Sequence, residues 1–187
     1  MKKNTFTPPR REILQAIVGA PLILAAGQAL ADGKPTTYSE LGKKAPKFNL
    51  KKFGGGTFSN ADFKGKTTIV EFWGLWCPDC MADAPLTAQV AARANSTKNL
   101  RFIGIHTAGR YGRWGSLDAY FKEKGYSYPV AIDDDKTAYN AFKMKWVPTY
   151  LIIDKNGIIA DFTTDLGIGG IGVDALLARA NKIAMRK

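Results

Sequence analysis

Cys77 and Cys80, the only two cysteines of this chain, are the residues whose type and spacing could do chemistry. Cysteines so close together can hold a metal, close a structural disulfide or act as a redox couple. A structural zinc site needs four ligands, and the single histidine, His106, is better explained as a structural residue. Cu(I), which two thiolates can hold, stays open. A structural disulfide over so short a loop stabilises by only about 2 kcal/mol, so redox chemistry fits the pair best.

The junction between a predicted strand and a predicted helix positions the cysteines. The apolar run TTIVEFWGLW, residues 67–76, predicts a strand buried on both faces, and helix-forming residues follow Cys80. At the helix N-cap the Cys77 sulfur faces unpaired N–H groups and the positive end of the helix dipole, which favour the nucleophilic thiolate. Pro78 suits the first helical position. Cys80, one turn further on, is placed to attack a mixed disulfide formed by Cys77.

Glu71 is the only charged residue in the predicted strand 67–76. Burial disfavours the charged form of a carboxyl group and raises its pKa. A carboxyl group that titrates near neutral pH can pass a proton to or from a thiol. The alternative is a glutamate that reaches solvent at the end of the strand.

Strands and helices alternate along the rest of the chain. A hairpin is predicted at its start, with a turn at Gly54–Gly56, and a second one with its turn at Asn156–Gly157. The predicted strands and hairpins cover residues 47–60, 67–76, 100–107, 128–135 and 149–164, and the predicted helices cover residues 81–96, 115–125, 136–144 and 173–187. This order predicts an α/β fold with a central mixed sheet flanked by helices.

Four motifs together resemble the thioredoxin superfamily. FWGLWCPDC, residues 72–80, lies at the strand-to-helix junction, and WVPT follows at residues 146–149. APKFNL, residues 45–50, and CMADAP, residues 80–85, narrow the resemblance to the exported TlpA/ResA branch of thiol-disulfide oxidoreductases. The resemblance covers residues 45–187 and implies a thioredoxin-like fold with an N-terminal β-hairpin extension.

The resemblance also implies roles for single residues. Cys77 matches the exposed nucleophile and Cys80 the resolving cysteine of a redox disulfide. Pro148 matches the cis-proline that faces this disulfide and exposes backbone for substrate pairing. Trp76 matches the residue before the nucleophile, on the apolar rim of the site. Glu71 matches the buried acid beneath the active site, which is Asp in thioredoxin itself.

Asp83 occupies the place of the Glu in the ResA-like pattern CxxCxxExP, where that residue is thought to tune the cysteines. It is shorter by one methylene, and the alternative is an ordinary acid favoured by the helix dipole. The CPDC motif itself has its proline directly after Cys77, as in oxidising DsbA and in glutaredoxins. Asp79 places a negative charge near the Cys77 thiolate, which opposes a low pKa of the Cys77 thiol. The direction of electron flow therefore stays open.

The first 31 residues predict an export leader. Lys2, Lys3 and the pair Arg10–Arg11 precede an apolar run that ends in small residues at Ala29 and Ala31, which predicts cleavage after Ala31. The arginine pair resembles a twin-arginine signal. Residues 32–46 form a polar lead-in, and the domain follows at residues 47–187. Cleavage would give a soluble periplasmic protein without a membrane span, whereas a retained leader would anchor it.

These observations predict an exported thiol–disulfide oxidoreductase that reduces or exchanges disulfides of cysteine-containing exported proteins. The resemblance implies a membrane thiol-disulfide electron donor and a possible part in cytochrome c maturation; no diffusible cofactor or metal is required. The net charge is +11, but scattered lysines without an interleaved aromatic stripe do not indicate nucleic-acid binding. The alternatives are a disulfide-donating oxidase, a Cu(I) metallochaperone and a peroxiredoxin-like peroxidase. The last needs a Pro-x-x-x-Thr/Ser-x-x-Cys setting that EFWGLWC lacks.

Overall fold

The computed structural model describes residues 34–167 and 169–186. The predicted leader, residues 1–31, lies outside this range, so its cleavage and its twin-arginine character stay predictions. In the part of the chain that the structure describes, no helix is both long and apolar enough to cross a membrane. Most of the predicted lead-in is described: it is largely irregular and joins the fold through a bridge between Lys44 and Ile158.

The elements follow the predicted alternation of strands and helices, with boundaries shifted by a few residues. Over the described residues the strands are β1 (Asn49–Lys52), β2 (Thr57–Ser59), β3 (Thr67–Trp73), β4 (Leu100–Thr107), β5 (Val130–Asp133), β6 (Thr149–Ile153) and β7 (Ile159–Thr164). The helices are η1 (Asn60–Phe63), α1 (Pro78–Asn95), η2 (Gly112–Trp114), α2 (Leu117–Lys124), α3 (Thr137–Ala141) and α4 (Gly172–Ala184).

Local signals explain where several elements begin and turn. The Ser116 side chain caps α2 by accepting from the N–H of Ala119, and Gly125 ends this helix in the left-handed region. The turn at Asn156–Gly157 is confirmed, since Gly157 has a φ of 78° and Asp154 Oδ1 accepts from the N–H of Asn156. These short-range features are ones that a sequence can specify.

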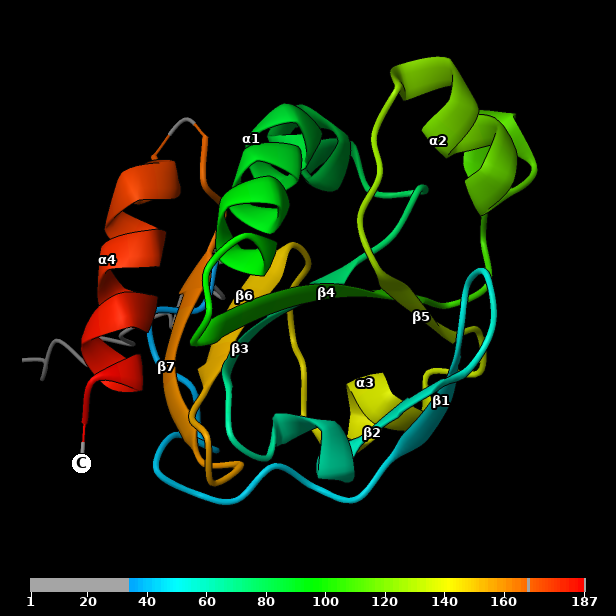
Figure 1. The fold of residues 1–187 in the computed structure, drawn as a ribbon. Helices are drawn as coiled ribbons and strands as arrows, with labels where there is room; N and C mark the ends of the chain where they lie inside the picture. Colours follow the sequence, from blue (N-terminus) through cyan, green and yellow to red (C-terminus); the bar gives the residue numbers. More distant parts are fainter. Residues whose placement is uncertain (1–33, 168, 187) are drawn as a thin grey trace, which may run out of the picture. The chain divides into compact units, whose positions relative to one another are not determined.

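A seven-stranded mixed sheet forms the centre of the described structure, in the order β2-β1-β5-β4-β3-β6-β7 (Figure 1). β3, β4 and β5 pair in parallel, while the other neighbours pair antiparallel. The sheet with flanking helices confirms the predicted fold class, and the β1–β2 hairpin adds the N-terminal extension. Because parallel strands end at one edge, the loops after β3 and β4 meet there, and antiparallel β6 starts at the same edge.

The two faces of the sheet carry separate cores. α1, α2 and α4 lie on one side of the sheet and α3 on the other (Figure 1). Every residue of β3 is buried, as predicted for a strand covered on both faces. Ile69 and Trp73 pack in the core under α1 and α4, whereas Val70 and Phe72 pack in the core beside α3. Alternation along the strand therefore places Glu71 on the α1 side.

Candidate active site

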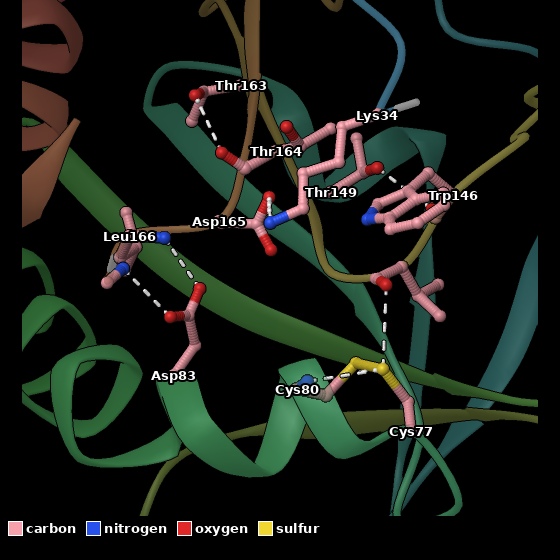
Figure 2. Close-up of polar contacts among 12 residues, drawn as sticks. Lys34, Cys77, Cys80, Asp83, Trp146, Thr149, Thr163, Thr164, Asp165 and Leu166 are labelled. Atoms are coloured by element: carbon pink, nitrogen blue, oxygen red, sulfur yellow. Dashed lines mark hydrogen bonds and ion pairs between the residues drawn. A yellow bond between two sulfur atoms is a disulfide. The ribbon is translucent and has the colours of Figure 1, made fainter. Parts of the chain in front are cut away.

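Cys77 occupies the N-cap of α1, as predicted, and Pro78 is the first residue of the helix. The backbone of Cys77 is extended, and its Sγ accepts a hydrogen bond from the N–H of Cys80 at 3.2 Å. The two sulfur atoms form a disulfide across Cα atoms 5.3 Å apart (Figure 2). A sulfur at this position lies at the positive end of the helix dipole, so a thiolate there is stabilised by the helix.

Accessibility distinguishes the two cysteines. Cys77 keeps 5% of its surface exposed and Cys80 only 1%, so Cys77 is the one that a partner can reach first. The peptide bond between Val147 and Pro148 is cis, as the resemblance implied. The Val147 carbonyl oxygen lies 3.5 Å from Cys77 Sγ, which places the segment before β6 directly against the disulfide.

Glu71 is buried under α1, with 1% of its surface exposed. It therefore does not reach solvent at the end of the strand. Its Oε1 accepts hydrogen bonds from Thr87 on α1 and Tyr150 on β6, each at 3.2 Å. Burial raises the pKa of Glu71 to about 8, the two hydroxyl groups lower it in part, and the negative charge of Asp83 raises it further. The structure thus provides a buried carboxyl group that titrates near neutral pH.

Asp83 binds the backbone of the loop after β7. Its two carboxylate oxygens accept hydrogen bonds from the N–H groups of Leu166 at 2.5 Å and Gly167 at 2.8 Å (Figure 2). The side chain is buried, so these bonds satisfy a carboxylate that water cannot. Gly167 suits this contact, because a Cβ atom there would lie 2.9 Å from Asp83 Oδ1 and would push the carboxylate aside. Asp83 therefore holds the start of the loop that follows β7.

A hollow of about 300 Å³ lies beside the start of α1. Its lining consists of Lys34, Asp79, Ala82, Asp83, Asp165 and Gly167. Lys34 of the lead-in forms an ion pair with the nearly buried Asp165, at 3.0 Å (Figure 2). Hydrogen bonding to Asp165 raises the pKa of Lys34. The lead-in thus reaches the same end of the sheet as the disulfide.

The end of β4 supports the rim of the site. Trp76, half-buried and directly before the nucleophile, donates its indole N–H to the Thr107 carbonyl at 3.0 Å. The guanidinium of Arg110 lies 4.4 Å from the centre of the Trp76 ring. His106 is fully buried, and its Nε2 accepts the N–H of Leu75 at 3.1 Å. His106 is therefore a buried histidine whose Nε2 is hydrogen-bonded, whereas its Nδ1 has no hydrogen-bond partner among the described residues. It contacts the loop that leads to Cys77.

Sequence reasoning missed Thr87, Tyr150 and the loop contact of Asp83. A signal for Thr87 was present, because it lies seven residues after Cys80 and therefore on the same helical face. Tyr150 had no such signal, since it reaches Glu71 through the register of β3 with β6. Among the described residues, no group of three or more His, Cys, Asp or Glu side chains is arranged to hold a metal ion.

The fold and this pair of cysteines define a thioredoxin-like thiol–disulfide oxidoreductase. The chain belongs to the AhpC/TSA family, whose model matches residues 41–162. It is 28% identical to the thiol-disulfide oxidoreductase ResA of Bacillus subtilis (strain 168), over 66% of this chain and 66% of that protein.

Two further comparisons cover more of the chain. The thiol-disulfide oxidoreductase ResA of Bacillus thuringiensis subsp. konkukian (strain 97-27) is 28% identical over 84% of this chain and 86% of that protein. A solved thiol:disulfide interchange protein of the thioredoxin family from Chlorobium tepidum TLS is similar with a TM-score of 0.59 and 26% identity, covering 82% of this chain and 99% of that one. The sequence resemblance to ResA-like oxidoreductases is thereby confirmed.

Proposed function

We propose that this protein is an exported oxidoreductase that reduces disulfide bonds in other exported proteins. The observation that carries the proposal is the placement of Cys77 Sγ at the N-cap of α1, 3.2 Å from the N–H of Cys80 and disulfide-bonded to Cys80. A thiolate formed there is stabilised by the helix N-terminus and lies at the more accessible end of the pair.

The proposed exchange has two steps. The Cys77 thiolate attacks one sulfur of a partner's disulfide, a mixed disulfide forms, and the partner's other sulfur leaves as a thiolate. The Cys80 thiolate then attacks Cys77 Sγ, the mixed disulfide breaks, and the partner's second sulfur leaves. The partner gains two electrons and takes up two protons, while Cys77 and Cys80 become the disulfide.

Glu71 serves the second step in this proposal. The Cys80 thiol must lose a proton before it attacks, and Cys80 has only 1% of its surface exposed to water. A buried carboxyl group whose pKa is raised to about 8 can accept this proton, because that pKa is close to the pKa of a thiol. Thr87 and Tyr150 hold the carboxyl group in place through Oε1.

Export and electron supply belong to the same proposal. The basic start, the apolar run and the small residues at Ala29 and Ala31 support a leader that directs the chain to the periplasm. There, a reductase must be reduced again after each turnover by a dithiol donor. We propose a membrane thiol-disulfide donor for this role, on the resemblance to the TlpA/ResA branch.

The first test is the reduction potential of the Cys77–Cys80 couple, measured on the full chain against glutathione. A value near that of thioredoxin, about −270 mV, is the expected result for a reductase. A value near that of DsbA, about −120 mV, would instead show a protein that donates disulfides.

Variants of the cysteines identify their roles. Cys80→Ser should trap a mixed disulfide between Cys77 and a disulfide-containing protein, because the resolving sulfur is absent. Cys77→Ser is the matched control and should trap none. If neither wild-type cycling nor trapping is seen, the proposal fails. Tight Cu(I) binding without exchange would then favour a metallochaperone, and peroxide consumption without a thiol partner would favour a peroxidase.

A further inference from the structure

We infer that His106 is a positioning residue for the redox couple: its imidazole holds the backbone that places Cys77 at the N-terminus of α1. This inference rests on the proposed function, since it assigns to His106 a part in setting the chemistry of Cys77. The sequence by itself predicts only a structural role for His106.

The contact is between His106 Nε2 and the N–H of Leu75, at 3.1 Å. Leu75 is the second residue after β3, whose pairing with β4 ends at Trp73 opposite His106. The N–H of Leu75 therefore lies beyond the hydrogen bonds between β3 and β4, and it donates to the His106 side chain instead. Both residues are buried, with Leu75 at 3% and His106 at 0% exposure, so water does not compete for this hydrogen bond.

The orientation of the imidazole is fixed on two sides. Tyr111 stacks on it with ring centres 4.8 Å apart and planes within 8°, and Trp73 meets it edge-on at 5.3 Å. Tyr111 is itself held by a hydrogen bond from its hydroxyl to Asp134 at 2.9 Å. Because Nε2 accepts a hydrogen bond here, the ring is neutral and carries its proton on Nδ1, which has no hydrogen-bond partner among the described residues. Burial lowers the pKa of His106 to about 4, which keeps the ring neutral under ordinary conditions.

The same segment holds the loop at two further points. The Thr107 carbonyl accepts the indole N–H of Trp76, and Gly112 packs so closely that a Cβ there would lie 3.2 Å from the Leu75 carbonyl oxygen. Residues 106–112 therefore contact this loop at both backbone polar groups of Leu75 and at the side chain of Trp76. Among these contacts, His106 contributes the side-chain acceptor.

This placement matters for the reactivity of Cys77, which is two residues from Leu75. The hydrogen bond from the Cys80 N–H to Cys77 Sγ stabilises a thiolate more than a thiol, because it is charge-assisted. A looser loop weakens this bond, raises the pKa of the Cys77 thiol and destabilises the reduced form. A couple whose reduced form is less stable is a weaker oxidant.

The test compares three substitutions at His106. His106→Phe keeps a ring for Tyr111 and Trp73 but removes the acceptor, and His106→Asn places its acceptor too far back to reach Leu75. His106→Gln has a longer side chain than Asn, so its amide oxygen can reach the N–H of Leu75. Two quantities are measured on the full chain: the pKa of Cys77, from thiolate absorbance against pH, and the equilibrium constant with glutathione.

The expected result is a shift in both quantities for the Phe and Asn variants. The equilibrium constant with glutathione should change about tenfold, equivalent to about 30 mV toward the reducing side. The pKa of Cys77 should rise by about one unit, whereas the Gln variant should stay near wild type. Phe63→Leu is the control: Phe63 is buried in the core on the other face of the sheet, so this change should lower stability without moving either quantity.

Lower stability of the Phe and Asn variants with unchanged thiol pKa and glutathione equilibrium would overturn the inference, because His106 would then act only in packing. The proposed function fails separately. If wild type does not exchange with glutathione, the thiol titration still compares the variants and decides the role of His106.

Discussion

Tyr150 stands directly opposite Glu71 on neighbouring strands and donates its hydroxyl to Glu71 Oε1 at 3.2 Å. Thr87 donates to the same oxygen from α1, and the two hydroxyl oxygens lie 2.7 Å apart. This small polar group is enclosed by the core under α1, where a charged carboxylate is costly and a neutral carboxyl group is not.

The first prediction concerns Glu71→Gln and the pH dependence of stability. The pKa of Glu71 is raised by burial to about 8 in the folded protein, above the ordinary value of 4.5 expected when unfolded. The contribution of Glu71 to the free energy of unfolding is therefore complete below pH 4.5, and it is lost as the pH rises toward 8. Between these values wild type should lose up to about 1.4 kcal/mol of stability per pH unit relative to the variant. Urea unfolding of the oxidised proteins at pH 5, 6, 7 and 8 measures this difference, and a constant difference across that range would contradict it.

The second prediction concerns the opposite pH dependence of His106. Burial is the main cause that lowers the pKa of His106, to about 4, and the charge of Asp134 raises it in part. The depressed pKa means that the folded state is favoured above pH 6.5 and loses stability as pH falls from 6.5 to 4. Relative to His106→Phe, wild type should lose about 3 kcal/mol over this range. Parallel stability curves for the two proteins would contradict the buried, neutral ring.

The third prediction couples Asp83 to Gly167. Asp83→Asn leaves one backbone N–H facing an amide N–H₂ group, and Gly167→Ala forces a Cβ toward Asp83 Oδ1, which would lie 2.9 Å away. Each change should cost about 1 to 3 kcal/mol of stability, measured by urea unfolding. The double variant should cost clearly less than the sum, because both changes break the same contact. Strict additivity would contradict this prediction, because the two changes would then act independently.

The fourth prediction concerns the ion pair of Lys34 with Asp165. In the wild type, Lys34 Nζ lies 3.0 Å from Oδ2 of the nearly buried Asp165. Lys34→Met leaves this carboxylate without its cation. Since the lysine is partly exposed, the loss should be modest, about 1 kcal/mol. Asp165→Asn removes the charge as well, so Lys34→Met should have little further effect in that background. Lys122→Met, at an exposed lysine of α2, is a matched control and should change stability little.

The sequence predicted the features of the site that depend on neighbouring residues. The N-cap position of Cys77, the role of Pro78 at the helix start and the buried strand with Glu71 all follow from short-range rules. The alternation of strands and helices was also sufficient for the fold class. The resemblance located Pro148, whose cis bond the structure contains.

The remaining features depend on contacts between distant segments, which no local pattern encodes. Asp83 binds Leu166 across 83 positions, and Tyr150 meets Glu71 across 79. The second pairing follows from the register of β3 with β6, and the first from the packing of α1 against the loop after β7. A single sequence reveals neither. His106 gave a weak signal for the same reason: its partner, the Leu75 backbone, becomes its neighbour only when β3 and β4 pair.

The strand order has a consequence for the slow motions of the protein. β3, which leads into the cysteine loop, lies inside the sheet between β4 and β6, while β2 and β7 form the two edges. Transient openings of a fold begin at such edges, and interior strands exchange their amide hydrogens last. The disulfide is thus attached to the most persistent part of the sheet. Fraying of either edge strand would therefore leave β3, and the loop from it to Cys77, in place.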